Sequence, residues 1–345
     1  MSVGLPAKAR AYSLFGALYQ IPVSEMMSLP VGARSNDVTS MYARGWLLMH
    51  YLLFEPARKG QLEAYLNGLG DGKPSAAAAA AAFGDLAKLD RNIDAYLGRN
   101  KFKAVIVPAS AIKVDAITLR ELSTGENAIM SLKIKSRRGV NPQQAAELAP
   151  MMRTAAAPFA NDAAVQTALA EAEFDTENFD AALAAADRAL AADAKQIDAL
   201  LYRGRSLAKL ASKAGTKDVE TWREVRKCFV SANSLDPEDP RPLIDFYLSI
   251  AASGEMPTLN SVAGLNRALE LAPHDVGLRM LVAQQSLVDG KAALARQSLV
   301  LVAANAHAGD LGTKASAILE KLDQEGAAAA LELLREPDAA PAAEQ

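Results

Sequence analysis

The chain has 345 residues, of which 50% are hydrophobic, 6% are aromatic and 22% are charged, and its formal net charge is −3. A slightly acidic chain is a poor match for nucleic acid, so no nucleic-acid partner is expected. The single cysteine, Cys228, excludes an internal disulfide framework and a cysteine-based zinc site. The longest mostly apolar run, residues 47–54, is far shorter than the roughly 20 residues that cross a bilayer. We therefore expect no transmembrane segment.

The first hundred residues are predicted to form a helical subdomain. One stretch is apolar nearly all round, as a buried helix would be, and the others carry apolar residues on one face. Ser75 and Asp85 stand where they could cap the last two helices. The predicted helices span residues 42–54, 61–69, 76–82 and 86–97.

The next segment has strand-like composition. Residues 104–107 and 112–119 are rich in β-branched side chains, and residues 132–135 alternate apolar with charged. Between them, a Ser-x-x-Glu capping box predicts a short helix over residues 123–130. We therefore expect a small β-containing connector over residues 101–140 that follows the subdomain of residues 1–100.

A helix ending recurs four times in the second half of the chain. The sequence Ala-Leu-Ala-Ala-Asp at Ala189 is echoed at Ala232, Ala268 and, more loosely, Val302, so that the successive copies lie 43, 36 and 34 residues apart. A period near 34 is typical of stacked helical hairpins. Such solenoids more often provide an interaction surface than a catalytic site.

The repeats resemble tetratricopeptide repeats. Small residues stand where two helices would cross, Pro237 marks a boundary between hairpins, and residues 213–219 lengthen one turn. Residues 141–325 are predicted to hold these repeats with a capping helix at 311–322, and residues 326–345 are predicted to be a flexible tail. A generic helical array without a binding groove is the alternative. The small crossing residues are Ala170, Ala182, Gly204, Ala283 and Ala295.

The resemblance implies a binding site on the inner face of the first helix of each hairpin. Thr167 and Glu171 stand where chaperone-binding members of the family use Lys and Asn to hold a peptide carboxylate, so that ligand class is not expected. Arg205 and Lys209 lie one helical turn apart and would suit an acidic peptide. The predicted groove residues are Thr167, Glu171, Leu201, Arg205, Lys209 and Gln284.

An ordered series of short motifs runs through the N-terminal part. The series comprises Val3-Gly-Leu-Pro6, Ile21-Pro22, Met26-Met27, Tyr42 with Trp46 and His50-Tyr51-Leu52, Leu62 with Tyr65-Leu66, Ala82-Phe-Gly-Asp-Leu86, and Tyr96-Leu97. It resembles the C-terminal half of gluzincin-like, peptidase-MA-type bacterial zinc metallopeptidase-related proteins. Many of these proteins carry tetratricopeptide repeats behind the peptidase-like domain.

The zinc chemistry of that family is missing from this sequence. Its members bind zinc through H-E-x-x-H, in which two histidines lie one helical turn apart. This chain has only His50, His274 and His307, and no two have that spacing. We therefore expect no catalytic residue, no metal and no cofactor. Either the chain is a truncated relative or its true start lies upstream; it is cytoplasmic as written, and periplasmic if an exported N-terminus precedes it.

The remaining candidates have ordinary structural interpretations. His50 is expected in a core, His274 and His307 in exposed turns, and Cys228 in a buried helix. The basic run at residues 133–138 could hold an anion, but a solvated strand edge is favoured.

The fold predicted is mainly α: a helical subdomain, a small β element and a tetratricopeptide-like α-solenoid. The function predicted is that of a non-catalytic scaffold that binds an unknown protein or peptide. The alternative is the C-terminal portion of an exported zinc peptidase whose active site lies upstream of Met1.

Overall fold

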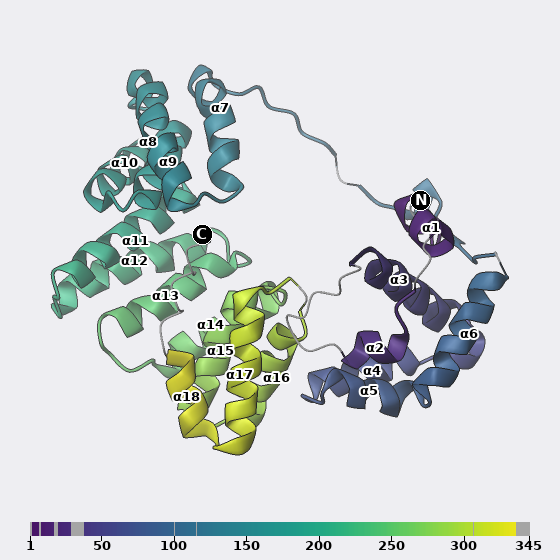
Figure 1. The fold of residues 1–345 in the computed structure, drawn as a ribbon. Helices are drawn as coiled ribbons and strands as arrows, with labels where there is room; N and C mark the ends of the chain where they lie inside the picture. The colour runs from purple at the N-terminus through teal and green to yellow at the C-terminus, as the bar shows by residue number, and fades with distance from the viewer. Residues whose placement is uncertain are drawn as a thin grey trace. The chain divides into compact units, whose positions relative to one another are not determined.

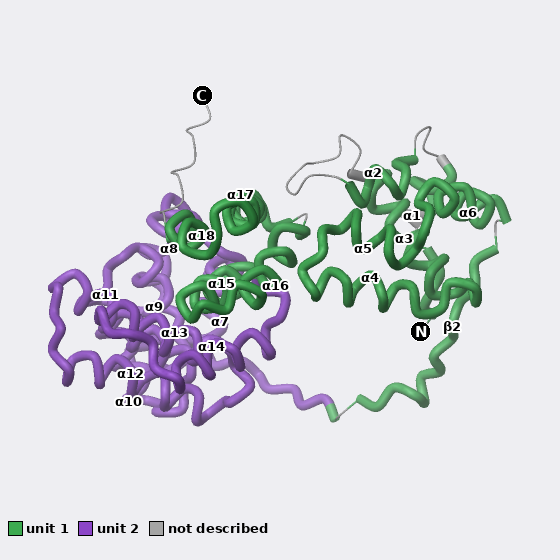
Figure 2. Tube along the Cα trace, turned by 90° about the horizontal axis from the view of Figure 1, so that it is seen from below, with its two compact units in different colours: residues 1–116, 276–345 green, residues 117–275 purple. Residues whose placement is uncertain are grey.

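The computed structural model describes residues 2–6, 8–16, 20–28, 38–99, 101–114, 116–305 and 307–335. The described chain is mainly helical, with one very small sheet (Figure 1). It divides into two compact units, residues 1–116 with 276–345, and residues 117–275 (Figure 2). The domain boundaries predicted after residues 100, 140 and 325 stay predictions. No described helix combines the length and the apolar character that a membrane span requires.

The N-terminal helices pack around α3, which the sequence predicts to be buried. Leu47 and Leu52 of α3 share a core with Phe83, Leu89 and Ile93 from later helices. The predicted helices over residues 61–69, 76–82 and 86–97 are confirmed as α4, α5 and α6. The elements are α1 (Lys8–Gly16), α2 (Val23–Ser28), α3 (Val38–Phe54), α4 (Gln61–Gly70), α5 (Ser75–Phe83) and α6 (Leu86–Gly98), with short 3-10 turns at Pro56–Arg58 and Ala109–Ala111.

Of the two predicted caps in this region, one is confirmed and one is wrong. The Asp85 carboxylate accepts a hydrogen bond from the Lys88 backbone N–H at 3.0 Å and caps α6. Ser75 is the first residue inside α5 rather than its cap, and its hydroxyl lies 3.0 Å from the Tyr65 hydroxyl instead. The Ser75 hydroxyl therefore contacts Tyr65 of α4 instead of capping the backbone N–H groups at the start of α5.

The predicted β element is smaller and differently placed. Strand β1 (Ser2–Val3) pairs antiparallel with β2 (Val105–Ile106), with Ser2 opposite Ile106. Residues 112–119 form no strand among those described, and residues 132–135 lie inside a helix, α7 (Thr124–Arg137). The prediction of strands there is wrong because four alternating residues also fit a helix.

Helix α7 begins at the predicted capping box, where Ser123 and Glu126 bond each other's backbone N–H groups. It continues to Arg137 because Ile129, Leu132 and Ser136, spaced three and four apart, are all buried. With α8 (Pro142–Ala156), it forms a helical hairpin, which the strand-like pattern of residues 132–135 did not predict. This hairpin packs on the first predicted repeat.

The predicted repeats are confirmed as helical hairpins. The long turn expected near residues 213–219 separates α11 from α12, and Gly290 takes a positive φ of 74° in the turn between α15 and α16. Within residues 117–275 the hairpins are α7–α8, α9 (Ala163–Asp175) with α10 (Phe179–Ala192), α11 (Ile197–Lys213) with α12 (Val219–Leu235), and α13 (Pro240–Ala252) with α14 (Leu259–Leu271).

The C-terminal segment holds two further hairpins, α15 (Val276–Val288) with α16 (Ala292–Ala303), and α17 (Asp310–Gln324) with α18 (Ala327–Arg335). Helix α17 confirms the predicted helix over residues 311–322, but it is not the terminal capping element of the described chain, because α18 follows it and packs on α17 and α15. The prediction of a flexible tail from residue 326 is wrong for α18, whose Ala330 and Leu334 are buried against neighbouring helices. Residues 336–345 lie outside the described residues.

Helix crossings depend on the predicted small residues. Ala170, Ala182, Ala283 and Ala295 are completely buried. At Gly204, in α11, a Cβ would lie 2.6 Å from Phe229 Cε1 and 3.0 Å from Cys228 Cβ of α12. These distances leave no room for a methyl group, so glycine permits the close approach of α11 and α12.

We predict that Gly204→Ala lowers the free energy of unfolding by about 1–3 kcal/mol, because the added methyl overpacks the crossing. Gly264→Ala in α14 is the matched control, since its Cβ would meet nothing closer than Leu243 Cδ2 at 3.6 Å. The control should be neutral or stabilising by about 0.5–1 kcal/mol, because alanine favours the helix. Urea unfolding followed by circular dichroism measures both, and equal effects would contradict the packing argument.

We also predict that a fragment of residues 117–275 folds cooperatively, whereas residues 161–275 alone melt at a lower temperature. Removing α7 and α8 uncovers the core that Ile129, Leu132 and Met152 share with Val165 and Ala168. Thermal melts of the two fragments test this. Identical midpoints would show that α7 and α8 contribute nothing to the stack.

Candidate functional site

The first helices of successive hairpins, α9, α11 and α13, pack side by side. We call the surface that they form the first-helix face. In tetratricopeptide-like stacks the partner binds on this face, so the groove residues were predicted on it.

Ion pairs cross this face from helix to helix. Arg137, at the end of α7, lies 3.0 Å from Glu171 of α9 (Nε to Oε2) and 2.5 Å from Asp198 of α11 (Nη2 to Oδ2). Asp198 also accepts a hydrogen bond from Arg241 of α13 at 2.7 Å. We call these residues, together with the pair described next, the ion-pair ladder. Its members are Arg137, Glu171, Asp198, Arg241, Arg205 and Asp245.

The Arg205–Asp245 pair links α11 to α13. The Arg205 Nε donates to Asp245 Oδ2 at 2.7 Å, and the guanidinium lies over the Tyr202 ring, 5.6 Å from its centroid. The positive charge of Arg205 is therefore neutralised by Asp245 within the protein. The predicted joint basic site of Arg205 and Lys209 is reduced to Lys209, which is exposed.

Burial shifts the pKa values of the ladder carboxyls. Burial raises the pKa of Glu171 above its ordinary value, and Arg137 and Ser136 offset only part of that effect. Burial likewise raises the pKa of Asp245 despite its pairing with Arg205. For Asp198 burial acts in the same direction, but the guanidiniums of Arg137 and Arg241 outweigh it and the pKa is lowered. The charged side chains of the ion-pair ladder are thus paired with one another and are not available to bind a ligand.

A groove of about 450 Å³ opens between α9, α11 and α13. Its surface is mainly apolar, with the Arg205–Asp245 pair among its lining residues and Lys209 and Ser212 exposed to solvent. This volume lies in the range of about 300–1,000 Å³ that is usual for ligand sites. The apolar lining residues are Phe174, Ala208, Phe229, Leu248 and Ala252.

The structure brings two of the six predicted groove residues, Arg205 and Lys209, to this groove. Thr167 is buried and its hydroxyl donates to the Ala163 carbonyl at 2.7 Å, and Glu171 is buried in the ladder. Leu201 is fully buried against Trp222 and its neighbours, so it belongs to the core. Gln284 lies on α15, in the other compact unit, and does not line the groove.

Sequence reasoning missed the contribution of α13. Asp245, Leu248 and Ala252 recur at spacings of three and four, whereas Tyr247 and Ile250 between them are buried. Both faces of α13 carry mostly apolar residues, so the sequence pattern alone does not separate the groove-lining residues from the buried ones.

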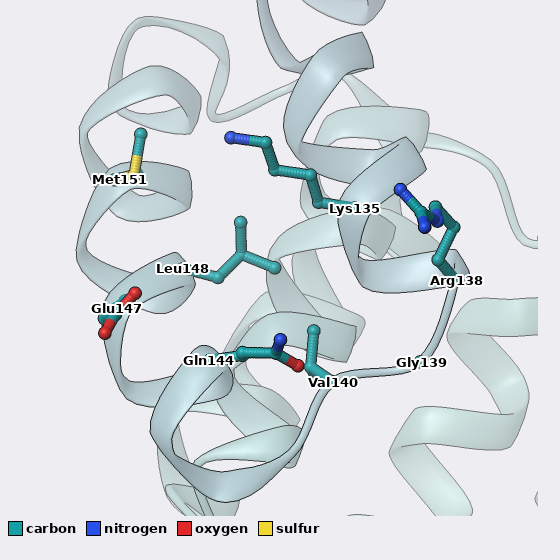
Figure 3. Close-up of a pocket in the computed structure, with 8 residues that line it drawn as sticks. All are labelled: Lys135, Arg138, Gly139, Val140, Gln144, Glu147, Leu148 and Met151. Carbon is teal, nitrogen blue, oxygen red and sulfur yellow. The ribbon is translucent and has the colours of Figure 1, made fainter.

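The basic run of residues 133–138 lies at the C-terminal end of α7, not on a strand edge. Cations are favourable at a helix C-terminus because of the helix dipole. Lys135 and Arg138 line a cavity of about 300 Å³ between α7 and α8, together with Glu147, Leu148 and Met151 (Figure 3). A carboxylate in the lining does not favour an anion there.

The histidines and the cysteine have structural surroundings. His50 is buried, its Nε2 donates to the Lys103 carbonyl at 3.0 Å, and its Nδ1 lies 2.9 Å from the Tyr96 hydroxyl. His274 and His307 are exposed in turns. Cys228 is buried and burial raises the pKa of its thiol. Within the described residues, no three His, Cys, Asp or Glu side chains are grouped to hold a metal ion.

No protein-family model and no curated protein matches this chain. Solved structures are similar over part of its length. A thermophilic TPR protein of Thermus thermophilus has 15% identity and a TM-score of 0.46, and the match covers 56% of this chain and 98% of that one. For PilF of Pseudomonas aeruginosa the identity is 19%, the TM-score 0.44 and the coverages 62% and 93%. For MamA of Desulfovibrio magneticus they are 14%, 0.38, 59% and 99%. At these identities the likeness concerns the fold alone.

The raised pKa of Glu171 predicts an unusual pH dependence. Because the folded state holds the proton more tightly than the unfolded state does, wild-type stability falls as pH rises from the ordinary value of 4.5 through the folded pKa. Glu171→Gln mimics the protonated side chain, so the variant should gain stability relative to wild type over this window. Urea unfolding at several pH values measures the difference.

Glu126→Gln is the control with the opposite sign. Arg120 and the Ser123 backbone lower the pKa of Glu126 from 4.5 to about 2. Wild type therefore gains stability as the pH rises from about 2 to the ordinary value of 4.5. Glu126→Gln should become less stable relative to wild type over this window. Parallel pH profiles for the two variants would contradict the assignment of Glu171 as a buried, proton-retaining carboxyl.

Proposed function

We propose that this protein is a non-catalytic scaffold that binds a segment of another protein in the groove between α9, α11 and α13. The observation that carries the proposal is the apolar lining of that groove on the first-helix face. Buried apolar surface contributes roughly 25 cal/mol per Å², so such a lining favours apolar anchor residues in a partner.

The charges of the groove narrow the ligand class. Arg205 and Asp245 neutralise each other, whereas Lys209 is exposed. A favourable partner segment therefore carries apolar side chains for the walls and an acidic residue that can approach Lys209. A ligand bound through charge alone is disfavoured, because the ladder already satisfies most of the charges on the first-helix face.

The fixed ladder also supports the proposal. Ion pairs from α7 through α13 hold neighbouring first helices in one register. A preformed groove binds with a smaller entropic cost than one that must be assembled. The peptidase alternative has no comparable supporting observation and forms no part of the proposal.

We predict that Leu248→Asp weakens binding of a peptide selected on the full chain at least tenfold. The reason is that the substitution places a charge in the apolar wall, where Leu248 is 40% exposed. Peptides are selected from a displayed library, and their affinities are measured by fluorescence anisotropy. Val230→Asp in α12 is the matched control, since Val230 is 53% exposed and does not line the groove.

Lys209→Glu should weaken the same peptides less, and its effect should shrink at high salt, because an exposed charge pair is screened. Equal affinity for wild type and Leu248→Asp would rule out the groove as the binding site. An equal loss of peptide affinity in Leu248→Asp and Val230→Asp would show that the substitutions damage the fold in general.

A further inference from the structure

Exposed apolar side chains gather where β1, β2 and α1 meet. Val3 and Val105 are paired across the two strands, and the Phe15 ring of α1 lies 6.3 Å from that of Phe102, just before β2. Tyr12 lies one turn before Phe15 on α1. We call these residues the N-terminal apolar surface: Val3 (49% exposed), Leu5 (57%), Tyr12 (79%), Phe15 (52%) and Val105 (54%). Ile106, opposite Ser2, lies on the other face of the strand pair and is not part of it.

The residues next to this surface are firmly anchored. Phe102 packs against Trp46 and His50, with ring centroids 5.4 and 5.2 Å apart, and His50 donates to the Lys103 carbonyl. At Gly4 a Cβ would lie only 2.7 Å from the Lys103 carbonyl oxygen. The apolar side chains therefore project from a defined scaffold, as they do at interaction sites.

The charges around the surface are mainly positive. Lys101 and Lys103 flank Phe102 and are exposed. The nearby Glu55 is paired with Arg99 at 3.2 Å. Residues 1–116 contain 13 Lys and Arg against 9 Asp and Glu, whereas the rest of the chain contains 24 against 31. Residues 276–345, which belong to the same compact unit, contain 6 against 9, so the excess of positive charge belongs to the first 116 residues, which carry the apolar surface, and not to the unit as a whole.

We propose that the N-terminal apolar surface docks on an anionic lipid bilayer, without crossing it. Aromatic and aliphatic side chains suit the boundary between headgroups and acyl chains, and lysines beside them suit lipid phosphates. Lysine is depleted at protein–protein interfaces, so its presence here favours a lipid surface over a protein partner. The surface shares no residue with the groove between α9, α11 and α13, so the two activities are independent.

The full chain is tested by co-sedimentation with phosphatidylcholine vesicles, with and without phosphatidylglycerol. We expect binding only to the anionic vesicles, and weaker binding at high salt. Each lysine near such a surface is worth roughly a factor of five. Lys101→Glu with Lys103→Glu should therefore reduce partitioning at least roughly 25-fold, and Val105→Ser with Tyr12→Ser should also weaken it. Circular dichroism verifies that each variant is folded.

Lys88→Glu with Arg91→Glu, exposed on α6, is the control with the same change in net charge. Binding should largely survive in this control. Three results overturn the proposal: no preference for anionic vesicles, an equal loss in the control, or self-association that Val105→Ser abolishes while vesicles are not bound. The last result would identify a protein interface instead.

Discussion

Helices in the repeat region approach each other closely because their crossing positions carry only a hydrogen atom or a methyl group. Gly204 against Phe229 is the tightest example, and Ala170, Ala182 and Ala295 serve the same purpose elsewhere. Interiors are packed as densely as organic crystals, so a single extra carbon at such a point cannot be absorbed without movement. The close packing of the two helices within a hairpin follows from these small residues, and the stack is built from such hairpins.

The ion-pair ladder becomes possible once the first helices are close. Arg137 can reach both Glu171 and Asp198, and Arg205 can reach Asp245, only because α7, α9, α11 and α13 stand side by side. Buried pairs of this kind contribute little net stability, since desolvation offsets the attraction, but they do select one arrangement of helices. Their consequence for recognition is that the first-helix face offers apolar surface, with its charges mostly neutralised.

The N-terminal helices use polar contacts in a different way. Arg44 is buried and contacts Asp90 and Asp94 of α6, and Asp90 also accepts from the Val23 backbone N–H. His50 joins α3 to the backbone of Lys103. These contacts tie segments distant in sequence into one core, while the apolar side chains of β1, β2 and α1 remain outside it.

Local signals were enough to predict the helical hairpins, because apolar periodicity, proline and glycine stops and small crossing residues all act within a few residues of chain. The starts of α7 and α6 were predictable in the same way, from the Ser123 capping box and from Asp85. Where a side chain had more than one available partner, the outcome depended on the packing of distant elements. Residues 132–135 are helical because α8 and α9 bury one face of α7. Glu171 is buried and paired with Arg137 of α7, and Leu201 lies in the core. The groove likewise depends on α13, whose Leu248 and Asp245 meet α11 from some 40 residues away. Such pairings depend on which surfaces the fold brings together, and a local pattern cannot specify that.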